Sequence, residues 1–255
     1  MSPVGDVGEL AAVAIETATE TVGIAVRTPE GVAAEFALTG RRRHVETLTP
    51  ALEHLLDQVG LAPGDLRVVA VDIGPGLFTG LRVGVAAAKG LAQALGIGVL
   101  CVTSLDVLTA AAAEVAHRGL VLACVDARRG EVFAAVRELD QDGETVAEPL
   151  ASGLWAPGDV AAALSRLAGS TMPVYAVGDG AQRYGEILGS APGVEIVTPG
   201  LSFPPPSTLL RLALARLEQG QTPVDAASVV PLYMREADAK SNFVRARGGT
   251  EPESR

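Results

Sequence analysis

Two segments of this chain share one pattern, and that pattern restricts the possible folds more than any other feature. Residues 13–27 (VAIETATETVGIAVR) and 123–137 (ACVDARRGEVFAAVR) align without a gap, with position 13 matched to position 123. Each contains an apolar strand ending in an acidic residue, Glu16 in the first and Asp126 in the second, followed by a polar hairpin and another apolar strand. The sequence therefore predicts a duplicated unit.

A shorter repeat supports the same organisation. VVAVDIGPG, which ends at Gly76, is similar to VYAVGDG, which ends at Gly180. A chain of 255 residues can form one large domain or two small ones. We expect an N-terminal subdomain over residues 10–112, a degenerate C-terminal subdomain over residues 118–240 and a disordered tail over residues 246–255.

Strands alternate with helices in this chain. Residues 11–39 are rich in Val, Ile and Thr and predict three antiparallel strands, and residues 41–59 predict an amphipathic helix that ends at Gly60. Further helices are expected over residues 79–95, after a Ser104 cap, and over residues 208–219 after a Ser207 cap. This order predicts an α/β layer architecture with mixed sheets, and the sequence leaves open whether the last helix packs back on the first subdomain.

Composition and charge narrow the class of protein. Hydrophobic residues make up 48% of the chain and charged residues 20%, which excludes a disordered protein. No apolar run is long enough to span a bilayer as a helix. The first residues, MSPVGDVGELAAVAIE, have no basic region, so we expect no secretory signal and a cytoplasmic protein. A net charge of -10 disfavours direct binding to a nucleic-acid backbone.

The chain has two cysteines. Cys101 and Cys124 lie in strand-like runs and are expected to be buried thiols.

The most informative segment is GPGLFTGLRVGVAAAKG, residues 74–90. Gly80, Gly84 and Ala88 fall four residues apart on one helical face, and a glycine inside a helix costs about 1 kcal/mol relative to alanine. Such a face indicates the close approach of another backbone, either the underlying strand or a helix of another subunit. A phosphate-binding loop is disfavoured because GxxxxGK[ST] is absent and Lys89 lies well inside the helix.

The two hairpins are candidate anion sites. In the first, Glu16 and Thr17 supply an acid and a hydroxyl that could bind a phosphate and its metal ion, but the lack of a glycine before Gly23 favours an ordinary hairpin with a polar turn. In the second, Arg128 and Arg129 could bind a carboxylate or a phosphate, or Arg128 could pair with Glu131 across the turn.

Catalytic motifs are scarce in the rest of the sequence. The three histidines, His44, His54 and His117, form no HExxH motif and no pair four residues apart. A GxSxG elbow and a Cys-His metal-ligand spacing are both absent. The sequence therefore predicts no catalytic residue, no metal site and no cofactor.

Four blocks of the chain resemble the TsaB (YeaZ) family: AIETATE, GPGLFTGLRVGVAAAKGLAQALGIGVLCVTSLDVL, DARRGEVF and PLYMRE. The resemblance runs from about Leu10 to about Ala239, and the GPG-x-FTGLR block is specific to that family. Two departures occur. The family's DTST is replaced by ETAT from Glu16, and its GPGSFTGLR has Leu77 in place of Ser.

The resemblance implies an actin/Hsp70-like ATPase (ASKHA) fold of two duplicated subdomains with mixed sheets flanked by helices. It implies a non-catalytic scaffold in the synthesis of N6-threonylcarbamoyladenosine at position 37 of transfer RNA. The catalytic relative, TsaD, transfers threonylcarbamoyl from threonylcarbamoyl-AMP to adenine 37 and holds a metal with two histidines. Ser104 and Leu108 align with those histidines, so the metal site is expected to be lost.

The same resemblance implies the partners. We expect a heterodimer with TsaD, recruitment of the ATPase TsaE, a homodimer when the chain is alone, transfer RNA only through the complex, and no membrane contact. The family's subunit contact lies on the first two helices. The residues expected there are Val45, Leu48, Leu52, Leu55, Leu56, Gly80, Leu81, Gly84 and Ala88.

Two other functions remain as alternatives. One is a nucleotide-binding ATPase or phosphotransferase that would use Glu16, Thr17 and the turn from Gly178 to Gly180. The other is a peptidase, which the lack of a nucleophile-base pair disfavours.

Overall fold

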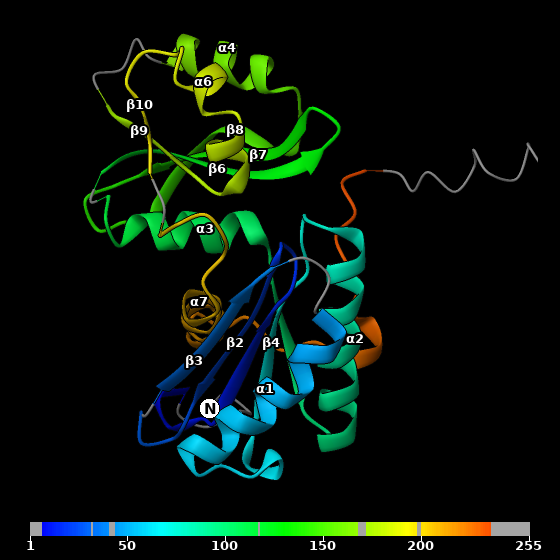
Figure 1. The fold of residues 1–255 in the computed structure, drawn as a ribbon. Helices are drawn as coiled ribbons and strands as arrows, with labels where there is room; N and C mark the ends of the chain where they lie inside the picture. Colours follow the sequence, from blue (N-terminus) through cyan, green and yellow to red (C-terminus); the bar gives the residue numbers. More distant parts are fainter. Residues whose placement is uncertain are drawn as a thin grey trace, which may run out of the picture.

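Two five-stranded mixed sheets with helices around them make up the structure (Figure 1). This computed structural model describes residues 7–31, 33–40, 44–116, 118–167, 172–197 and 200–235. The tail expected over residues 246–255 lies outside these ranges.

The first sheet has the strand order β3-β2-β1-β4-β5. The strands are β1 (Ala12–Glu16), β2 (Thr21–Arg27), β3 (Ala33–Thr39), β4 (Val68–Asp72) and β5 (Gly98–Val102). The first three pair antiparallel, as expected, and β4 and β5 run parallel to β1. Strands β1 and β4 are buried along their whole length, which requires cover on both faces of the sheet.

The second sheet repeats this topology, with the order β10-β9-β6-β7-β8. Its strands are β6 (Gly119–Arg128), β7 (Glu131–Leu139), β8 (Thr145–Trp155), β9 (Val174–Val177) and β10 (Val194–Ile196). Again an antiparallel three-stranded meander is extended by strands parallel to its first member. The expected pair of duplicated α/β subdomains is confirmed.

The register of the ladders corrects the second sequence repeat. Ala12 pairs with Val68 in the first sheet, and Leu122, its equivalent in the first repeat, pairs with Ala176 in the second sheet. Val68 of β4 therefore corresponds to Ala176 of β9, whereas matching Gly76 to Gly180 would place it opposite Met172. The Gly-rich turns resemble each other in sequence because both need glycine with positive φ, at Gly74 and Gly178, and not because they are equivalent positions.

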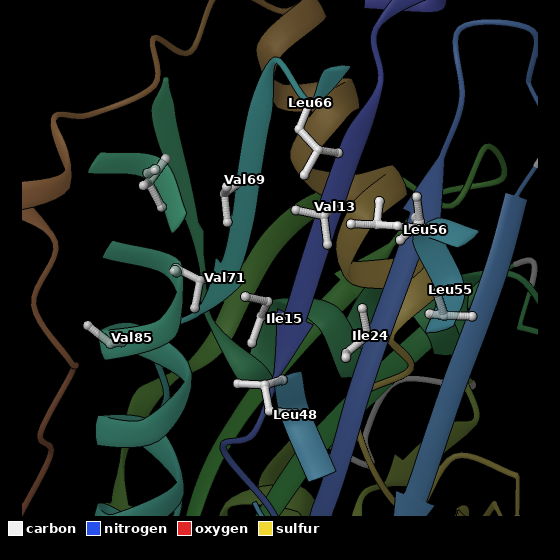
Figure 2. Packing of buried hydrophobic residues seen from close by; sticks show 14 of the residues in the cluster. Val13, Ile15, Ile24, Leu48, Leu55, Leu56, Leu66, Val69, Val71 and Val85 are labelled. Atoms are coloured by element: carbon white, nitrogen blue, oxygen red, sulfur yellow. The ribbon is translucent and has the colours of Figure 1, made fainter. Parts of the chain in front are cut away.

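Helices cover both faces of the first sheet. Helices α1 (His44–Val59) and α2 (Phe78–Leu95) lie on one face, where Leu48 of α1 and Val85 of α2 join one buried cluster with Ile15 and Val71 of the sheet (Figure 2). Helix α7 (Pro206–Glu218) lies on the other face, although its sequence follows the second sheet. Among the described residues, we find no helix with the length and apolar character needed to span a bilayer.

The second sheet is covered in the same way. Helix α3 (Ser104–Ala113) packs on one face with Leu105 and Leu108, although its sequence follows the first sheet. The opposite face is covered by α4 (Pro157–Leu167), α5 (Asp179–Arg183) and α6 (Gly185–Leu188). The described residues also contain three short 3-10 helices, η1 (Val7–Glu9), η2 (Pro63–Asp65) and η3 (Ala226–Ser228).

Helices α3 and α7 meet between the two sheets (Figure 1). Asp106 of α3 forms ion pairs with Arg216 of α7 at 2.9 Å and with Arg137 of β7 at 3.1 Å. Burial alone raises the pKa of Asp106, but hydrogen bonds and charge from Arg216, together with hydrogen bonds from Thr103 and Arg137, lower it below its usual value. One carboxylate therefore joins elements that pack on different sheets.

Two of the expected helix caps are wrong. Thr103, not Ser104, caps α3, and its hydroxyl accepts the N–H of Asp106. Helix α7 begins at Pro206 after Pro205, so Ser207 lies inside its first turn. Ser104 is fully buried and bonds to Asp72 instead. A hydroxyl residue at a strand-helix junction can bond locally or across the fold, and sequence spacing does not distinguish the two.

The cysteines differ in exposure. Cys124 is fully buried, as expected, whereas Cys101 is only partly buried. Both are free thiols, and burial raises the pKa of each.

Replacing Leu209 with alanine tests the position of α7. Leu209 is fully buried between α7 and the first sheet, so Leu209→Ala should lower the free energy of unfolding by about 2–5 kcal/mol. Urea unfolding measures the change. The control Glu218→Ala alters an exposed residue of the same helix and should change stability by no more than about 0.5 kcal/mol. Equal effects of the two substitutions would contradict the packing of α7.

Candidate partner-binding site

The hairpin between β1 and β2 lies against a row of glycines at the start of α2. A Cβ atom added to Gly80 would lie 2.0 Å from the Thr17 carbonyl oxygen, and one on Gly84 would lie 2.1 Å from Thr17 Oγ1. Before the helix, a Cβ on Gly76 would lie 2.1 Å from the Ala18 carbonyl oxygen. Each glycine is therefore required by a contact within this chain.

Hydrogen bonds hold the hairpin against these glycines, and we call the surface formed by Gly76, Gly80 and Gly84 the glycine groove. Thr17 Oγ1 donates to the Gly80 carbonyl oxygen over 2.8 Å, and the Leu77 N–H donates to the Ala18 carbonyl oxygen over 2.6 Å. This bond uses the backbone N–H of position 77, which every residue except proline can supply. Leucine therefore fits at this position, where the TsaB (YeaZ) family has serine. The hairpin is thus the neighbour that the small-residue face of Gly80 and Gly84 accommodates, rather than a helix of another subunit.

Two carboxyl groups meet at the ends of adjacent parallel strands below this hairpin. Glu16 ends β1 and Asp72 ends β4, and both are fully buried. Glu16 Oε1 accepts the Ala18 N–H over 2.9 Å, while Asp72 Oδ1 accepts the Gly74 N–H over 2.7 Å and the Ser104 hydroxyl over 2.8 Å. Glu16 Oε2 and Asp72 Oδ2 have no donor among the described residues while both groups are ionised.

A proton shared by the two acids satisfies these oxygens. Burial raises the pKa of Glu16 well above its usual value, and the charge of Asp72 and a hydrogen bond to it raise it further. Burial also raises the pKa of Asp72, although hydrogen bonds from Glu16, Gly74 and Ser104 oppose this. Protonated Glu16 donates to Asp72, and the pair then carries one buried charge instead of two.

These contacts correct the expected nucleotide role of the first hairpin. Glu16 and Thr17 have no exposed surface, and the Thr17 hydroxyl is bonded to α2. Neither side chain can reach a nucleotide in this structure. The described residues also contain no group of three or more His, Cys, Asp or Glu side chains that could hold a metal ion.

The positions aligned with the metal-binding histidines of the catalytic relative are also internal. Ser104 bonds to Asp72, and Leu108 packs in the core of the second sheet. Both have no exposed surface, so neither faces a cleft.

The second hairpin supplies a link between the two subdomains. Arg128 lies at a bulge with a φ of 64°, and its guanidinium pairs with Asp126 at 2.8 Å and with Glu20 of the first hairpin at 2.7 Å. Of the two alternatives for Arg128, the pair with Glu131 is not formed, because Glu131 pairs with Arg235. Arg129 also has a positive φ, of 57°, and its contact with an anion stays a prediction.

The second subdomain also has a pair of acids near the ends of two adjacent parallel strands, β6 and β9. Asp179 Oδ1 accepts the Asp126 N–H over 2.9 Å, and burial raises the pKa of Asp179. Arg128 and Arg183 both face Asp126, the latter at 3.5 Å. Arginines therefore offset the charge of this pair, whereas a proton does so in the first subdomain.

A pocket of about 650 Å³ opens where the amino ends of α1 and α2 meet beside the first hairpin. The residues that line it include Val45, Leu77, Phe78, Val83 and Arg128. Val45 is 73% exposed and Phe78 44% exposed, which is unusual for large apolar side chains so close together. This surface has the character of a protein-docking site.

The structure separates the expected interface residues into two groups. Val45 is exposed and Leu52 is partly buried. The remaining residues are buried, although Gly80 also lines the pocket: Leu48, Leu55, Leu56, Gly80, Leu81, Gly84 and Ala88. The helical stripe that is visible in the sequence is the side that packs on the chain's own sheet, and the contact of these residues with a partner stays a prediction.

Sequence reasoning missed the outer face of α2. Phe78, an exposed aromatic residue within the FTGLR block, was a usable signal. Ala86, Gly90 and Ala94 form an exposed row of small residues four apart, and a Cβ on Gly90 would meet nothing within 4 Å. This row offers a close approach to a second helix without disturbing the fold.

Two alanine substitutions in α2 test the glycine groove. Gly80→Ala should lower the free energy of unfolding by about 1–3 kcal/mol because the new methyl group meets the Thr17 backbone. Gly90→Ala, in the same helix but in open space, should raise it by up to about 1 kcal/mol. Thermal and urea unfolding compare the two. Equal stabilisation by both would refute the close contact.

Removing one acid tests the shared proton. Because the pKa of both Glu16 and Asp72 is raised in the folded state, the parent should lose stability as pH rises from about 4.5 through the folded pKa. Glu16→Gln keeps a donor for Asp72 and should be increasingly more stable than the parent as pH rises, by no more than about 1.4 kcal/mol per pH unit. Urea unfolding from pH 4.5 to 9 measures this difference. The exposed control Glu53→Gln should show the same change of stability with pH as the parent. If the stability of Glu16→Gln changes with pH in parallel with that of the parent, Glu16 does not carry the shared proton.

Comparison with known proteins places these features in a family. The family model described as TsaD, tRNA N6-adenosine threonylcarbamoyltransferase, matches residues 25–243. The tRNA threonylcarbamoyladenosine biosynthesis protein TsaB of Bacillus subtilis (strain 168) is 30% identical over 236 residues, 92% of this chain and 98% of that protein. The TsaB protein of Escherichia coli (strain K12) is 30% identical over 222 residues, 87% of this chain and 93% of that protein.

A solved structure extends this similarity to the fold. The structure of YeaZ from Pseudomonas aeruginosa has a TM-score of 0.74 and 29% sequence identity, and the match covers 88% of this chain and 99% of that chain. The sheet topology and this similarity confirm the expected fold of two duplicated subdomains, each with a mixed sheet flanked by helices. The chain therefore belongs to the TsaB (YeaZ) family.

Proposed function

We propose that this chain is a non-catalytic, cytoplasmic subunit in the synthesis of N6-threonylcarbamoyladenosine at position 37 of transfer RNA. It would dock onto a TsaD-type transferase, which transfers threonylcarbamoyl from threonylcarbamoyl-AMP to adenine 37. The names of its relatives in Bacillus subtilis and Escherichia coli support a place in this biosynthesis. In this proposal TsaE joins the complex, transfer RNA is reached only through it, and the chain self-associates when alone.

The observation that carries the proposal is the contrast between a filled interior and an exposed apolar surface. The acidic residues at the strand ends of the first subdomain are buried beneath a hairpin that is bonded to α2. Outside, Val45 and Phe78 expose apolar surface beside a pocket of about 650 Å³. A chain with buried reactive groups and an exposed apolar surface is suited to binding a protein rather than to catalysis.

The docking surface in this proposal consists of Val45 and Leu52 of α1 and of Phe78, Val83, Ala86, Gly90 and Ala94 of α2. Its small residues permit close helix packing, and its larger ones supply apolar area. A homodimer through this surface would compete with the heterodimer, because both would cover the same residues.

An ATPase or phosphotransferase is the alternative function. It would need donors free to bind phosphates, but the Thr17 hydroxyl is bonded to Gly80 and Arg128 is paired with two carboxylates. Calorimetry of the isolated chain with ATP and Mg²⁺ separates the two functions. Saturable binding together with turnover would replace our proposal by this alternative.

Two substitutions on the outer faces of α1 and α2 test the docking surface. Gly90→Leu adds bulk in open space and Val45→Glu adds charge to an exposed apolar residue, so both variants should remain folded. Each should weaken binding to the TsaD-type protein of the same organism by about 10-fold or more. Gly84→Leu is unsuitable because it would collide with Thr17.

Calorimetry and the mass of the co-purified complex measure binding, and circular dichroism checks the fold. Ile187→Glu is the matched control, because Ile187 is an exposed apolar residue of the second subdomain (45% exposed). It should bind like the parent. Normal binding by both Gly90→Leu and Val45→Glu would show that the partner docks elsewhere.

A further inference from the structure

The last described segment of the chain, residues 221–235, runs back along the first subdomain, and we call it the C-terminal strap. Val224 exchanges backbone hydrogen bonds of 2.8 and 2.9 Å with Val99 of β5, and the Leu232 N–H donates to the Ile73 carbonyl oxygen over 2.7 Å. Lys89 of α2 donates to two strap carbonyl oxygens, at 3.0 and 3.2 Å. Figure 1 shows the strap in orange and red beside α2. It is fixed along its length.

The strap places one side chain beside the start of α2. The ring of Tyr233 lies 5.1 Å from the ring of Phe78, centroid to centroid. Arg82, one turn further along α2, stacks over Phe78 with its Cζ atom 3.8 Å from the ring centroid, and its Nε donates to the Tyr233 hydroxyl over 3.2 Å. We call Phe78, Arg82 and Tyr233 the aromatic platform. Both of its aromatic residues are 44% exposed, so a preformed group of side chains faces solvent.

Arg82 differs from the arginines between the subdomains in its charge environment. Arg128, Arg137 and Arg216 each pair with at least one carboxylate. No carboxylate lies within 4.0 Å of Arg82 in the part of the chain that the structure describes. The guanidinium keeps free N–H groups and an uncompensated positive charge on a chain whose net charge is -10. That combination fits a carboxylate from outside the chain.

The platform is continuous with the docking surface, because Phe78 belongs to both and lines the pocket next to Val45. We propose that the aromatic platform binds a carboxylate side chain of the TsaD-type partner, with Arg82 as the ionic contact and Tyr233 as the residue that positions it. This inference rests on the proposed function and adds the C-terminal strap to the interface. Aromatic residues and arginine are the residue types that most often dominate binding energy at such surfaces.

A phosphate of transfer RNA is the other anion that Arg82 could bind. The surroundings favour a protein carboxylate, because Val45, Phe78 and Val83 beside the platform are apolar. The net charge of -10 also opposes the many phosphates of a nucleic-acid backbone more than it opposes one carboxylate. The experiment below separates the two.

Calorimetry with the purified TsaD-type protein of the same organism tests the proposal through two variants. Arg82→Gln removes the charge and should raise the Kd by about 10-fold or more. Tyr233→Phe keeps the ring but removes the hydroxyl that holds Arg82, and should raise the Kd by a smaller factor, about 2- to 5-fold. Raising the salt concentration from about 50 to about 300 mM should weaken the parent complex more than the Arg82→Gln complex. Arg166→Gln, at an exposed arginine of α4, is the matched control and should bind like the parent.

The outcomes distinguish this inference from the proposed function. If Gly90→Leu abolishes binding while Arg82→Gln binds like the parent with the same salt dependence, the platform contact is refuted and the docking surface stands. If the parent itself does not bind the TsaD-type protein, both proposals fail. If Arg82→Gln weakens binding of the free chain to transfer RNA but leaves the protein complex unchanged, the ligand is a phosphate and the proposal is overturned.

Discussion

The contact between the first hairpin and the glycines of α2 is the constraint on which the rest of this structure depends. Thr17 and Ala18 approach Gly76, Gly80 and Gly84 so closely that no side chain larger than hydrogen fits. This contact fixes α2 against the sheet, buries the ends of β1 and β4 and directs the opposite side of α2 to solvent. A segment that resembles a nucleotide-binding loop in sequence is therefore internal packing, and the outward face of the same helix is left for another protein.

The buried acids show how two copies of one fold diverge. Each subdomain carries acidic residues where its central parallel strands end, and each must offset their charge. In the first, burial raises the pKa of both Glu16 and Asp72, which favours one proton shared between them. In the second, Arg128 and Arg183 pair with Asp126, and Arg128 also forms an ion pair with Glu20 of the first subdomain. Both solutions use groups of the chain itself, which agrees with a structural role for these acids.

Sequence reasoning predicted the fold well and the site only in part. Alternating strands and helices, together with the repeat of residues 13–27 at 123–137, identify the duplicated sheets, because β-hairpin chemistry and helix periodicity are local signals. The helical stripe of Leu48, Leu55 and Leu56 is visible for the same reason, but periodicity does not show what covers a face, and in the structure the chain's own sheet covers this one. Phe78 and Gly90 are single residues without a periodic pattern, and their exposure depends on how α2 lies on the sheet.

The sequence by itself determined the fold class, the duplication, the family and the small residues of α2, since each is encoded by neighbouring residues or by a short motif. Only the tertiary structure decided which residue fills the glycine groove, which acid shares a proton and which arginine is paired. It alone brought Tyr233, near the end of the described chain, to Phe78 in the first subdomain. The physical reason is that burial, charge pairing and close contact are properties of residues from distant segments, and no local pattern specifies which of them meet.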